Sequence, residues 1–180
     1  MELNNGFRLS NRNTLLDALE SLIAENSVHD ITLEKVAVHA GITRGGLIYH
    51  FKSKEALLMA LVERMRQRVD AHCGDLAPEG RPPLKTFLIG RIDYAFAMPP
   101  KEKKTMANLL AAAATYPCLL GPVKAMYDSG IEALNGDGEA AGLVLSIWTA
   151  LDGFILLEML NIRHFSALER QQMKDCSFAR

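Results

Sequence analysis

The chain has few of the features that mark a secreted protein, a metalloprotein or a membrane protein. Its three cysteines, Cys73, Cys118 and Cys176, lie far apart and form no CxxC pair, which gives neither a zinc motif nor a disulfide framework. A reducing cytoplasm is therefore the simpler expectation. The first residues lack the apolar core of a signal peptide. The longest apolar run, residues 140–157, contains Asp152, which favours a buried helix over a membrane span.

Motifs of catalysis are also absent. The sequence contains no GxSxG, no glycine-rich phosphate loop, no HExxH and no pair of carboxylates at motif spacing. The scattered histidines are typical of surface positions. The net charge of −1 argues neither for nor against a nucleic-acid partner. We therefore expect no enzyme, no metal and no cofactor.

The most informative stretch is residues 31–58, where two short helical patterns flank a turn. Thr32 is a suitable N-cap for the first helix, and Gly41 ends it because glycine readily adopts a left-handed conformation. Thr43 caps the second helix, which runs to about His50. Two short helices joined by a glycine-containing turn form a helix-turn-helix, whose second helix normally enters the DNA major groove.

The charge pattern supports a DNA-binding function for this stretch. Residues 35–54 contain no acidic residue, whereas the rest of the first seventy residues is rich in acids. A basic segment of this kind is suited to face phosphate. The residues expected at the DNA from this pattern are Thr32, Arg44, Gly45, Gly46, Tyr49, His50 and Lys52.

Two adjacent glycines, Gly45 and Gly46, lie inside the second helix. Each costs about 1 kcal/mol relative to alanine in a helix interior. Close approach of the backbone to DNA explains at least one of them, and we expect Gly46 to let the helix sit deeper in the groove. The alternative is a solvated helix with no ligand and a partly buried tyrosine.

The run AGITRGGLIYHFKSKEALL, residues 40–58, resembles the DNA-binding signature of the tetracycline-repressor (TetR) family of bacterial transcription regulators. The resemblance implies DNA contacts from Thr43 and Lys54 as well. It also implies a homodimer formed through the last two helices, and repression that a ligand relieves. Gly46 and Ile48 depart from the family pattern and remove polar side chains, so base readout by this helix is expected to be sparse.

The rest of the chain predicts an all-α fold of about nine helices, because apolar residues recur at helical spacing and no segment alternates like a β-strand. Residues 1–9 are expected to form a loose arm, with Ser10 capping the first helix. Residues 1–55 would form the helix-turn-helix DNA-binding domain, and residues 56–180 a helical effector-binding and dimerisation domain. A long helix from Lys54 would connect the two domains.

The helix expected at residues 139–161 is apolar on nearly every side and must be covered all round. Gly142, Ser146, Ala150 and Gly153 form a ridge of small residues on it. We predict that this ridge contacts a second copy of the chain. The alternative is a central helix buried within one protomer.

Five residues of the C-terminal domain are candidates for the wall of a ligand cavity, namely Phe96, Met106, Tyr127, Trp148 and Asp152. Asp152 would anchor a cationic group on the effector, and the flexible methionines would suit an apolar one. The alternative is that Trp148 belongs to the core and Asp152 pairs with a neighbour.

The function predicted from these features is a homodimeric, ligand-released transcriptional repressor that binds a pseudo-palindromic operator in the cytoplasm. One alternative is a helical small-molecule-binding protein whose helix-turn-helix is only structural, which would show no salt-dependent affinity for DNA. Others are a regulator controlled by a protein partner, and an enzyme whose chemistry leaves no motif.

Overall fold

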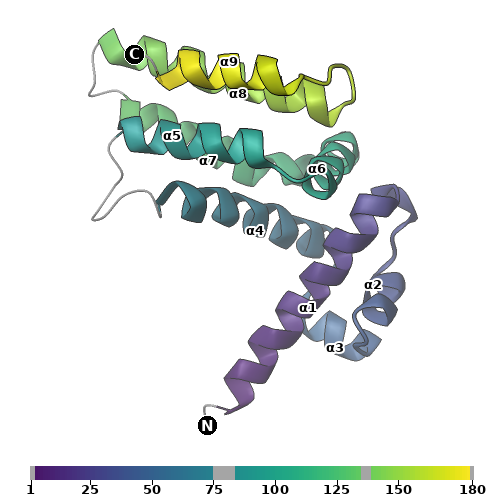
Figure 1. Cartoon of the computed structure of the whole chain (residues 1–180). Coiled ribbons are helices and arrows are strands. Elements are labelled where there is room, and N and C mark those ends of the chain that lie inside the picture. The colour runs from purple at the N-terminus through teal and green to yellow at the C-terminus, as the bar shows by residue number, and fades with distance from the viewer. Residues whose placement is uncertain (1–2, 75–83, 135–138, 179–180) are drawn as a thin grey trace. The chain divides into compact units, whose positions relative to one another are not determined.

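The computed structural model describes residues 3–74, 84–134 and 139–178, and every regular element in these ranges is helical (Figure 1). The all-α fold is therefore confirmed. The helices are α1 Leu3–Glu25, η1 Val28–Asp30, α2 Leu33–His39, α3 Arg44–His50, α4 Lys54–Gly74, α5 Leu84–Ala97, α6 Pro100–Ala112, η2 Pro117–Leu119, α7 Leu120–Leu134, α8 Glu139–Met159 and α9 Ala167–Phe178.

The start of α1 differs from the expectation that Ser10 caps it, because the helix already begins at Leu3. Residues 4–9 contain no proline. Leu15, Leu16 and Leu19, which are fully buried, fix the helix further along the chain. Adding residues to an existing helix needs no new nucleus, so α1 extends toward the N-terminus at little cost.

The chain divides into two compact units. The first unit contains Met1–Arg64 together with Lys104–Val123, and the second contains Met65–Lys103 together with Lys124–Arg180. Helices α4, α6 and α7 each contribute residues to both units. The domain boundary predicted between residues 55 and 56 remains a prediction.

The core of the first unit lies where α1 packs on α2 and α3. The buried side chains at its centre are leucines of α1 and α4, with Val36 from α2 and Leu47 from α3. Each such side chain contributes on the order of 2 kcal/mol on leaving water. Arg64 of α4 adds polar contacts to α1, with carboxylate oxygens of Asp17 at 2.6 Å and Glu20 at 2.5 Å.

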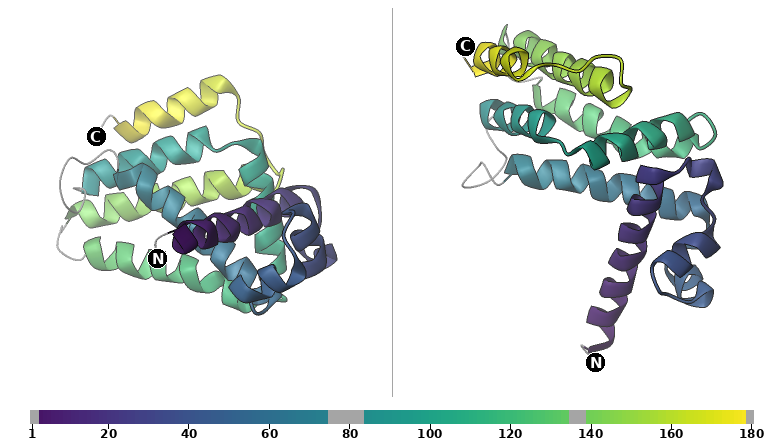
Figure 2. Two further views of the ribbon diagram at one scale, coloured as in Figure 1. Left: turned by 90° about the horizontal axis from the view of Figure 1, so that it is seen from below. Right: turned by 45° about the vertical axis from the view of Figure 1, so that its right-hand side comes forward.

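In the second unit, α5 packs on both α8 and α9, and two views show these helices running alongside one another (Figure 2). Ile92 and Ala95 of α5 meet Leu151 and Phe154 of α8 in one buried cluster. Phe96 stacks on Phe154 with a centroid separation of 4.5 Å.

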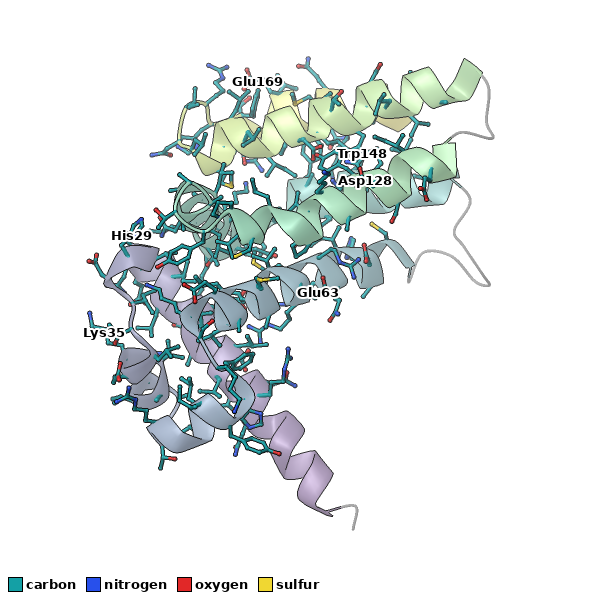
Figure 3. The ribbon with its side chains drawn as sticks, turned by 180° about the vertical axis from the view of Figure 1, so that it is seen from behind. His29, Lys35, Glu63, Asp128, Trp148 and Glu169 are labelled. Carbon is teal, nitrogen blue, oxygen red and sulfur yellow. The ribbon has the colours of Figure 1, made fainter. Side chains whose placement is uncertain are left out.

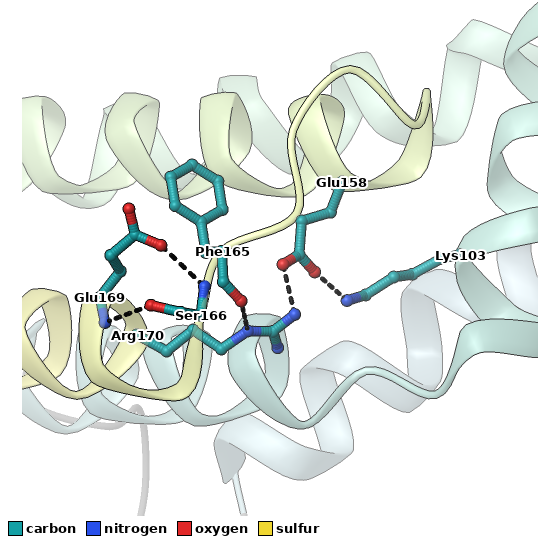
Figure 4. Close-up of polar contacts among 6 residues, drawn as sticks. All are labelled: Lys103, Glu158, Phe165, Ser166, Glu169 and Arg170. Carbon is teal, nitrogen blue, oxygen red and sulfur yellow. Dashed lines mark hydrogen bonds and ion pairs between the residues drawn. The ribbon is translucent and has the colours of Figure 1, made fainter.

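Glu158 of α8 brings three helices together (Figure 4). Its side chain is 2% exposed and forms ion pairs with Lys103 of α6 and Arg170 of α9. Arg170 also donates through Nε to the carbonyl of Phe165 at 3.1 Å. Burial raises the pKa of the Glu158 carboxyl, but the hydrogen bond and charge of Lys103 and the charge of Arg170 outweigh it and hold the pKa below its ordinary value.

The start of α9 is fixed by a reciprocal pair of hydrogen bonds, as Figure 4 also shows. The backbone N–H of Glu169 donates to Oγ of Ser166 at 3.2 Å, and the N–H of Ser166 donates to the Glu169 carboxylate at 2.7 Å. This arrangement is a capping box. The backbone and side-chain hydrogen bonds of Ser166, followed by that of Arg163, lower the pKa of Glu169 to about 2.

We predict that Glu158→Ala lowers the free energy of unfolding by about 3–5 kcal/mol, because it leaves two partly buried cations without their counter-charge. Denaturation in urea at neutral pH and fixed protein concentration measures this loss. The fold lowers the pKa of Glu158, so the wild-type contribution is present above the unfolded-state pKa and is lost as pH falls through the folded-state value.

The matched control is Glu132→Ala, which removes an exposed carboxylate from α7. That change should alter stability by no more than about 0.5 kcal/mol. Equal effects of the two substitutions would contradict a stabilising network around Glu158.

Candidate nucleic-acid interface and buried polar cluster

The helix-turn-helix is held by caps at both of its short helices. Oγ1 of Thr32 accepts from the backbone N–H of Lys35 at 3.2 Å, and Oγ1 of Thr43 accepts from the N–H of Gly46 at 3.1 Å. Gly41 has a φ of 64°, the left-handed conformation expected at the end of α2. The hydroxyls of both threonines therefore serve the backbone of the motif.

The outer face of α3 presents the side chains expected to meet DNA. Arg44 is exposed at the start of the helix and Tyr49 is 57% exposed near its end. His50 lies edge-on to Tyr49 with a centroid separation of 5.1 Å. Lys52 is exposed just beyond the helix. The structure thus gathers these four residues on one short segment.

Arg44 has an acidic neighbour that the sequence pattern did not reveal. Its Nε lies 3.1 Å from a carboxylate oxygen of Glu34 on α2, and the two side chains are 72% and 54% exposed. An ion pair this exposed contributes about 0.2–1 kcal/mol. Arg44 can therefore exchange this partner for a phosphate or a base edge at small cost.

The two glycines of α3 have different surroundings. A Cβ added to Gly45 would meet no atom within 4 Å, whereas a Cβ added to Gly46 would lie 2.9 Å from Cγ2 of Ile42 and 3.3 Å from Oγ1 of Thr43. Gly46 therefore makes room for the turn. Gly45 is the glycine on the open face, where backbone approach by a ligand is unobstructed.

Lys54 is engaged inside the first unit. Its Nζ donates to the carbonyl of Val28 at 2.6 Å and lies 5.6 Å from the ring centroid of Tyr116. Asn108 of α6 contributes to the same region, since its amide donates to the carbonyl of Ile23 at 2.6 Å. No sequence pattern pointed to Asn108 and Tyr116, because they lie more than fifty residues beyond Lys54 in the chain.

In the second unit, three of the five candidate ligand residues come together around Arg91 of α5. A carboxylate oxygen of Asp152 lies 3.2 Å from Arg91 Nη2 and the other accepts from the hydroxyl of Tyr127. The Tyr127 ring stacks on Trp148 at 5.1 Å, and the Arg91 guanidinium lies 5.3 Å from the centroid of the indole. We call Arg91, Tyr127, Trp148 and Asp152 the Arg91 cluster.

Phe96 and Met106 lie elsewhere. Phe96 belongs to the aromatic packing around Phe154, and Met106 falls in the first compact unit. Arg91 itself was missed in the sequence, although a signal exists. It follows the buried Leu88 by three residues and precedes the buried Ala95 by four, so a charge occupies the apolar face of a helix.

Trp148 lies between α7 and α8 (Figure 3). It is 2% exposed, and Gly130 of α7 leaves the space it fills, since a Cβ there would come within 2.0 Å of the indole. Burial raises the pKa of Asp152, although the hydrogen bond from Tyr127 and the charge of Arg91 oppose this shift. Burial and then the hydrogen bond to Asp152 raise the pKa of Tyr127 well above its ordinary value.

The four small residues of α8 lie on the side of the helix away from its core. Gly142, Ser146 and Ala150 are exposed and Gly153 is half-buried. The hydroxyl of Ser146 donates to the carbonyl of Gly142 at 2.8 Å, so it demands no outside partner. The large apolar side chains exposed on α8 and directly after it are Leu143, Leu145, Leu156 and Leu160. We call these four leucines and the four small residues the α8 stripe.

Helix α8 is long and apolar enough to cross a membrane, over Ala141–Met159 with a mean hydropathy of 1.6, which by itself is weak evidence for a span. Only 28% of that stretch is buried within the chain, and the α8 stripe accounts for much of the rest.

Among the described residues, no group of three or more His, Cys, Asp or Glu side chains is placed to hold a metal ion.

Two family models match the chain, one in its N-terminal part and one in its C-terminal part. The model of bacterial regulatory proteins of the tetR family matches residues 15–61. The model of the tetracyclin repressor-like C-terminal domain matches residues 85–176. The capped helices and turn define a helix-turn-helix protein with an all-helical C-terminal part. Since the second match alone covers half of the chain, the protein belongs to the TetR family of bacterial regulatory proteins.

Individual relatives match over shorter stretches. The tetracycline repressor protein class A from transposon 1721 of Escherichia coli is 35% identical over 78 residues, which are 43% of this chain and 35% of that protein. The HTH-type transcriptional repressor BepR of Brucella suis biovar 1 (strain 1330) is 34% identical over 55 residues, 31% of this chain and 26% of that protein. The matches thus span little more than a third of these curated relatives at most.

The fold as a whole is shared with solved structures. A transcriptional regulator from Pseudomonas aeruginosa PAO1 has a TM-score of 0.72 and 20% sequence identity, and the match covers 93% of this chain and 86% of that one. At this identity the likeness concerns the fold.

We predict opposite effects on stability for the two glycines of α3. Gly45→Ala should raise the free energy of unfolding by up to about 1 kcal/mol, because alanine is the better helix former and the added methyl meets nothing. Gly46→Val should lower it, because its branched side chain must displace Ile42. Urea denaturation compares the two, and equal shifts of the same sign would contradict the assignment.

Proposed function

We propose that the protein is a homodimeric transcriptional repressor that binds a two-fold symmetric operator and leaves it when a small effector binds. The observation that carries this proposal is the exposed basic and aromatic face of α3 on a capped helix-turn-helix. Membership of a family of regulatory proteins supports it. Membership of this family also favours a regulator over an enzyme. A regulator that binds DNA is expected in the cytoplasm.

We divide the candidate DNA-binding residues into those that contact the duplex and those that hold the helix-turn-helix in shape. Arg44, Gly45, Tyr49, His50 and Lys52 reach the duplex directly. Arg44, in the first turn of α3, is the candidate for a guanine edge, and the others meet phosphate or backbone.

The remaining candidates, Thr32, Thr43, Gly46 and Lys54, support this interface from within. Their hydrogen bonds and packing hold the turn and the ends of the helices. Base readout rests on few side chains, because α3 is short and two of its residues are glycine.

A second copy of the chain is the occupant we propose for the α8 stripe. Small residues at helical spacing let two helices approach closely, and the flanking leucines supply apolar area. The hydroxyls on this face bond to their own helix, so the surface buries few unsatisfied polar groups. Leu168 and Met173 of α9 are also exposed apolar side chains.

The effector site that we propose is the Arg91 cluster of the second unit. An effector that binds the operator-free form more tightly than the operator-bound form weakens DNA binding, and DNA weakens effector binding by the same factor. In this cluster, stacked aromatic rings and a part-buried ion pair meet. A regulator controlled by a protein partner would lack this response.

The decisive experiment is selection of bound duplexes from a random DNA pool. We expect an inverted repeat, with half-sites about 34 Å apart or more, because a symmetric dimer presents two recognition helices. Arg44→Ala should relax the preference at one base pair in each half-site, at a cost of about 1–3 kcal/mol in discrimination. Affinities for the selected and a scrambled duplex across a salt series measure both terms.

Glu34→Gln is the matched partner of that variant. It removes the carboxylate that competes with DNA for Arg44, so affinity should rise for all sequences by about 0.2–1 kcal/mol. Selected duplexes without an inverted repeat would overturn the proposed dimeric readout. A uniform loss in Arg44→Ala would make Arg44 a phosphate contact only.

We predict that Ala150→Glu dissociates the dimer, because it places a charge in the middle of an apolar contact. Burying an unpaired charge costs several kcal/mol, so the dissociation constant should rise at least about 100-fold. Sedimentation velocity measures this change. Ala125→Glu, on the exposed side of α7, carries the same charge and should leave the dimer intact. An unchanged Ala150→Glu dimer would place the contact elsewhere.

A further inference from the structure

The guanidinium of Arg91 is held as a receptor would hold a cationic ligand. It lies 5.3 Å from the centroid of the Trp148 ring, 3.2 Å from an oxygen of Asp152 and 3.5 Å from Sδ of Met126. An aromatic face with a carboxylate beside it is the usual way in which proteins recognise organic cations. Here the cation belongs to the chain itself.

An arginine at this position is poorly explained by stability. Its side chain is 9% exposed, and its neighbours on the same face of α5 are the buried Leu88, Ile92 and Ala95. Replacing a buried ion pair by apolar residues of similar volume is often neutral or stabilising. For stability alone, apolar residues in place of Arg91 on α5 and Asp152 on α8 would therefore serve as well.

The cluster is also reachable and adjustable. The Asp152 side chain, which lies beside the guanidinium, is 23% exposed to solvent. Tyr127 and the Gly130 gap, both on α7, set the position of the indole. A group that replaced the guanidinium would thus touch α5, α7 and α8 together.

We propose that Arg91 is a built-in occupant of the effector site, and that the effector is a small organic cation that displaces its guanidinium from Trp148 and Asp152. This inference rests on the proposed effector-responsive function. It assigns the ligand class and makes Arg91 a competitor of the ligand.

Competition between Arg91 and the cation predicts the direction in which the cation affinity changes when Arg91 is replaced. The apparent affinity of the cation is reduced by the small fraction of molecules in which Arg91 has left the site. Removing the Arg91 side chain should therefore strengthen cation binding. If the effector were instead an anion received by Arg91, the same change would abolish binding.

The test uses the full chain without DNA and follows the fluorescence of Trp148, the only tryptophan in the sequence. The probe is ethylguanidinium at constant ionic strength, with ethylurea as its neutral isostere. We expect saturable binding to the wild type, binding at least about tenfold tighter to Arg91→Ala, and loss of binding in Asp152→Asn. Arg163→Ala, which removes an exposed guanidinium from the same unit, should match the wild type.

Three outcomes would overturn the inference. They are binding to Arg91→Ala no tighter than to the wild type, equal responses to ethylurea and ethylguanidinium, and binding of butyrate that depends on Arg91. Circular dichroism checks that each variant is folded. Arg91→Gln, which keeps the length of the side chain without its charge, serves if the alanine variant unfolds. If both variants unfold, the contrast between the two isosteric probes on the wild type decides.

Release of the selected operator separates this inference from the proposed function. Ethylguanidinium that binds at Trp148 but leaves the DNA complex intact would uphold the cation site and contradict release by effector. Effector release that persists in Asp152→Asn, with unchanged Trp148 fluorescence, would uphold the repressor and overturn the site.

Discussion

The second unit depends on two carboxylates of α8, the half-buried Asp152 and the buried Glu158, that pair with groups on neighbouring helices. Asp152 takes Arg91 from α5 and Tyr127 from α7, and Glu158 takes Lys103 from α6 and Arg170 from α9. These partners are charged or polar, because a buried charge without a partner costs several kcal/mol. Each of them comes from a different helix. Apolar packing alone permits helices to slide, whereas these pairs are satisfied in one register. The surrounding helices are thereby placed on α8.

This arrangement gives α8 two faces with different chemistry. The inward face carries Trp148, Asp152 and Glu158, all of which contact neighbours in the same unit. The α8 stripe faces outward and has little polarity left, since its serine bonds to its own helix. An effector that altered the inward pairs would act on the same helix that presents the proposed dimer surface. Effector binding and the spacing of two recognition helices would then share one structural element.

The first unit rests on local interactions. Two threonine caps, a left-handed glycine and a core of leucines specify the helix-turn-helix. The ion pair with Glu34 partly neutralises the charge of Arg44 on its outer face. One non-local element enters this unit. Asn108 and Tyr116, from α6 and the segment after it, contact the backbone and side chains around the end of α1 and the start of α4. Residues 104–123, which follow a segment of the second unit, thus belong to the first unit.

The sequence alone determined the features set by short-range physics. Caps at Thr32 and Thr43, the turn at Gly41 and the all-helical class follow from the preferences of neighbouring residues, and the structure has all of them. The start of α1 was misplaced because an N-cap residue also fits inside a helix that packing has already fixed. Tertiary structure alone decided that Gly46 serves the turn, that Lys54 bonds to Val28, and that Arg91 fills the space between Trp148 and Asp152. These outcomes depend on side chains brought together from distant parts of the chain, and no local preference encodes which of them will meet.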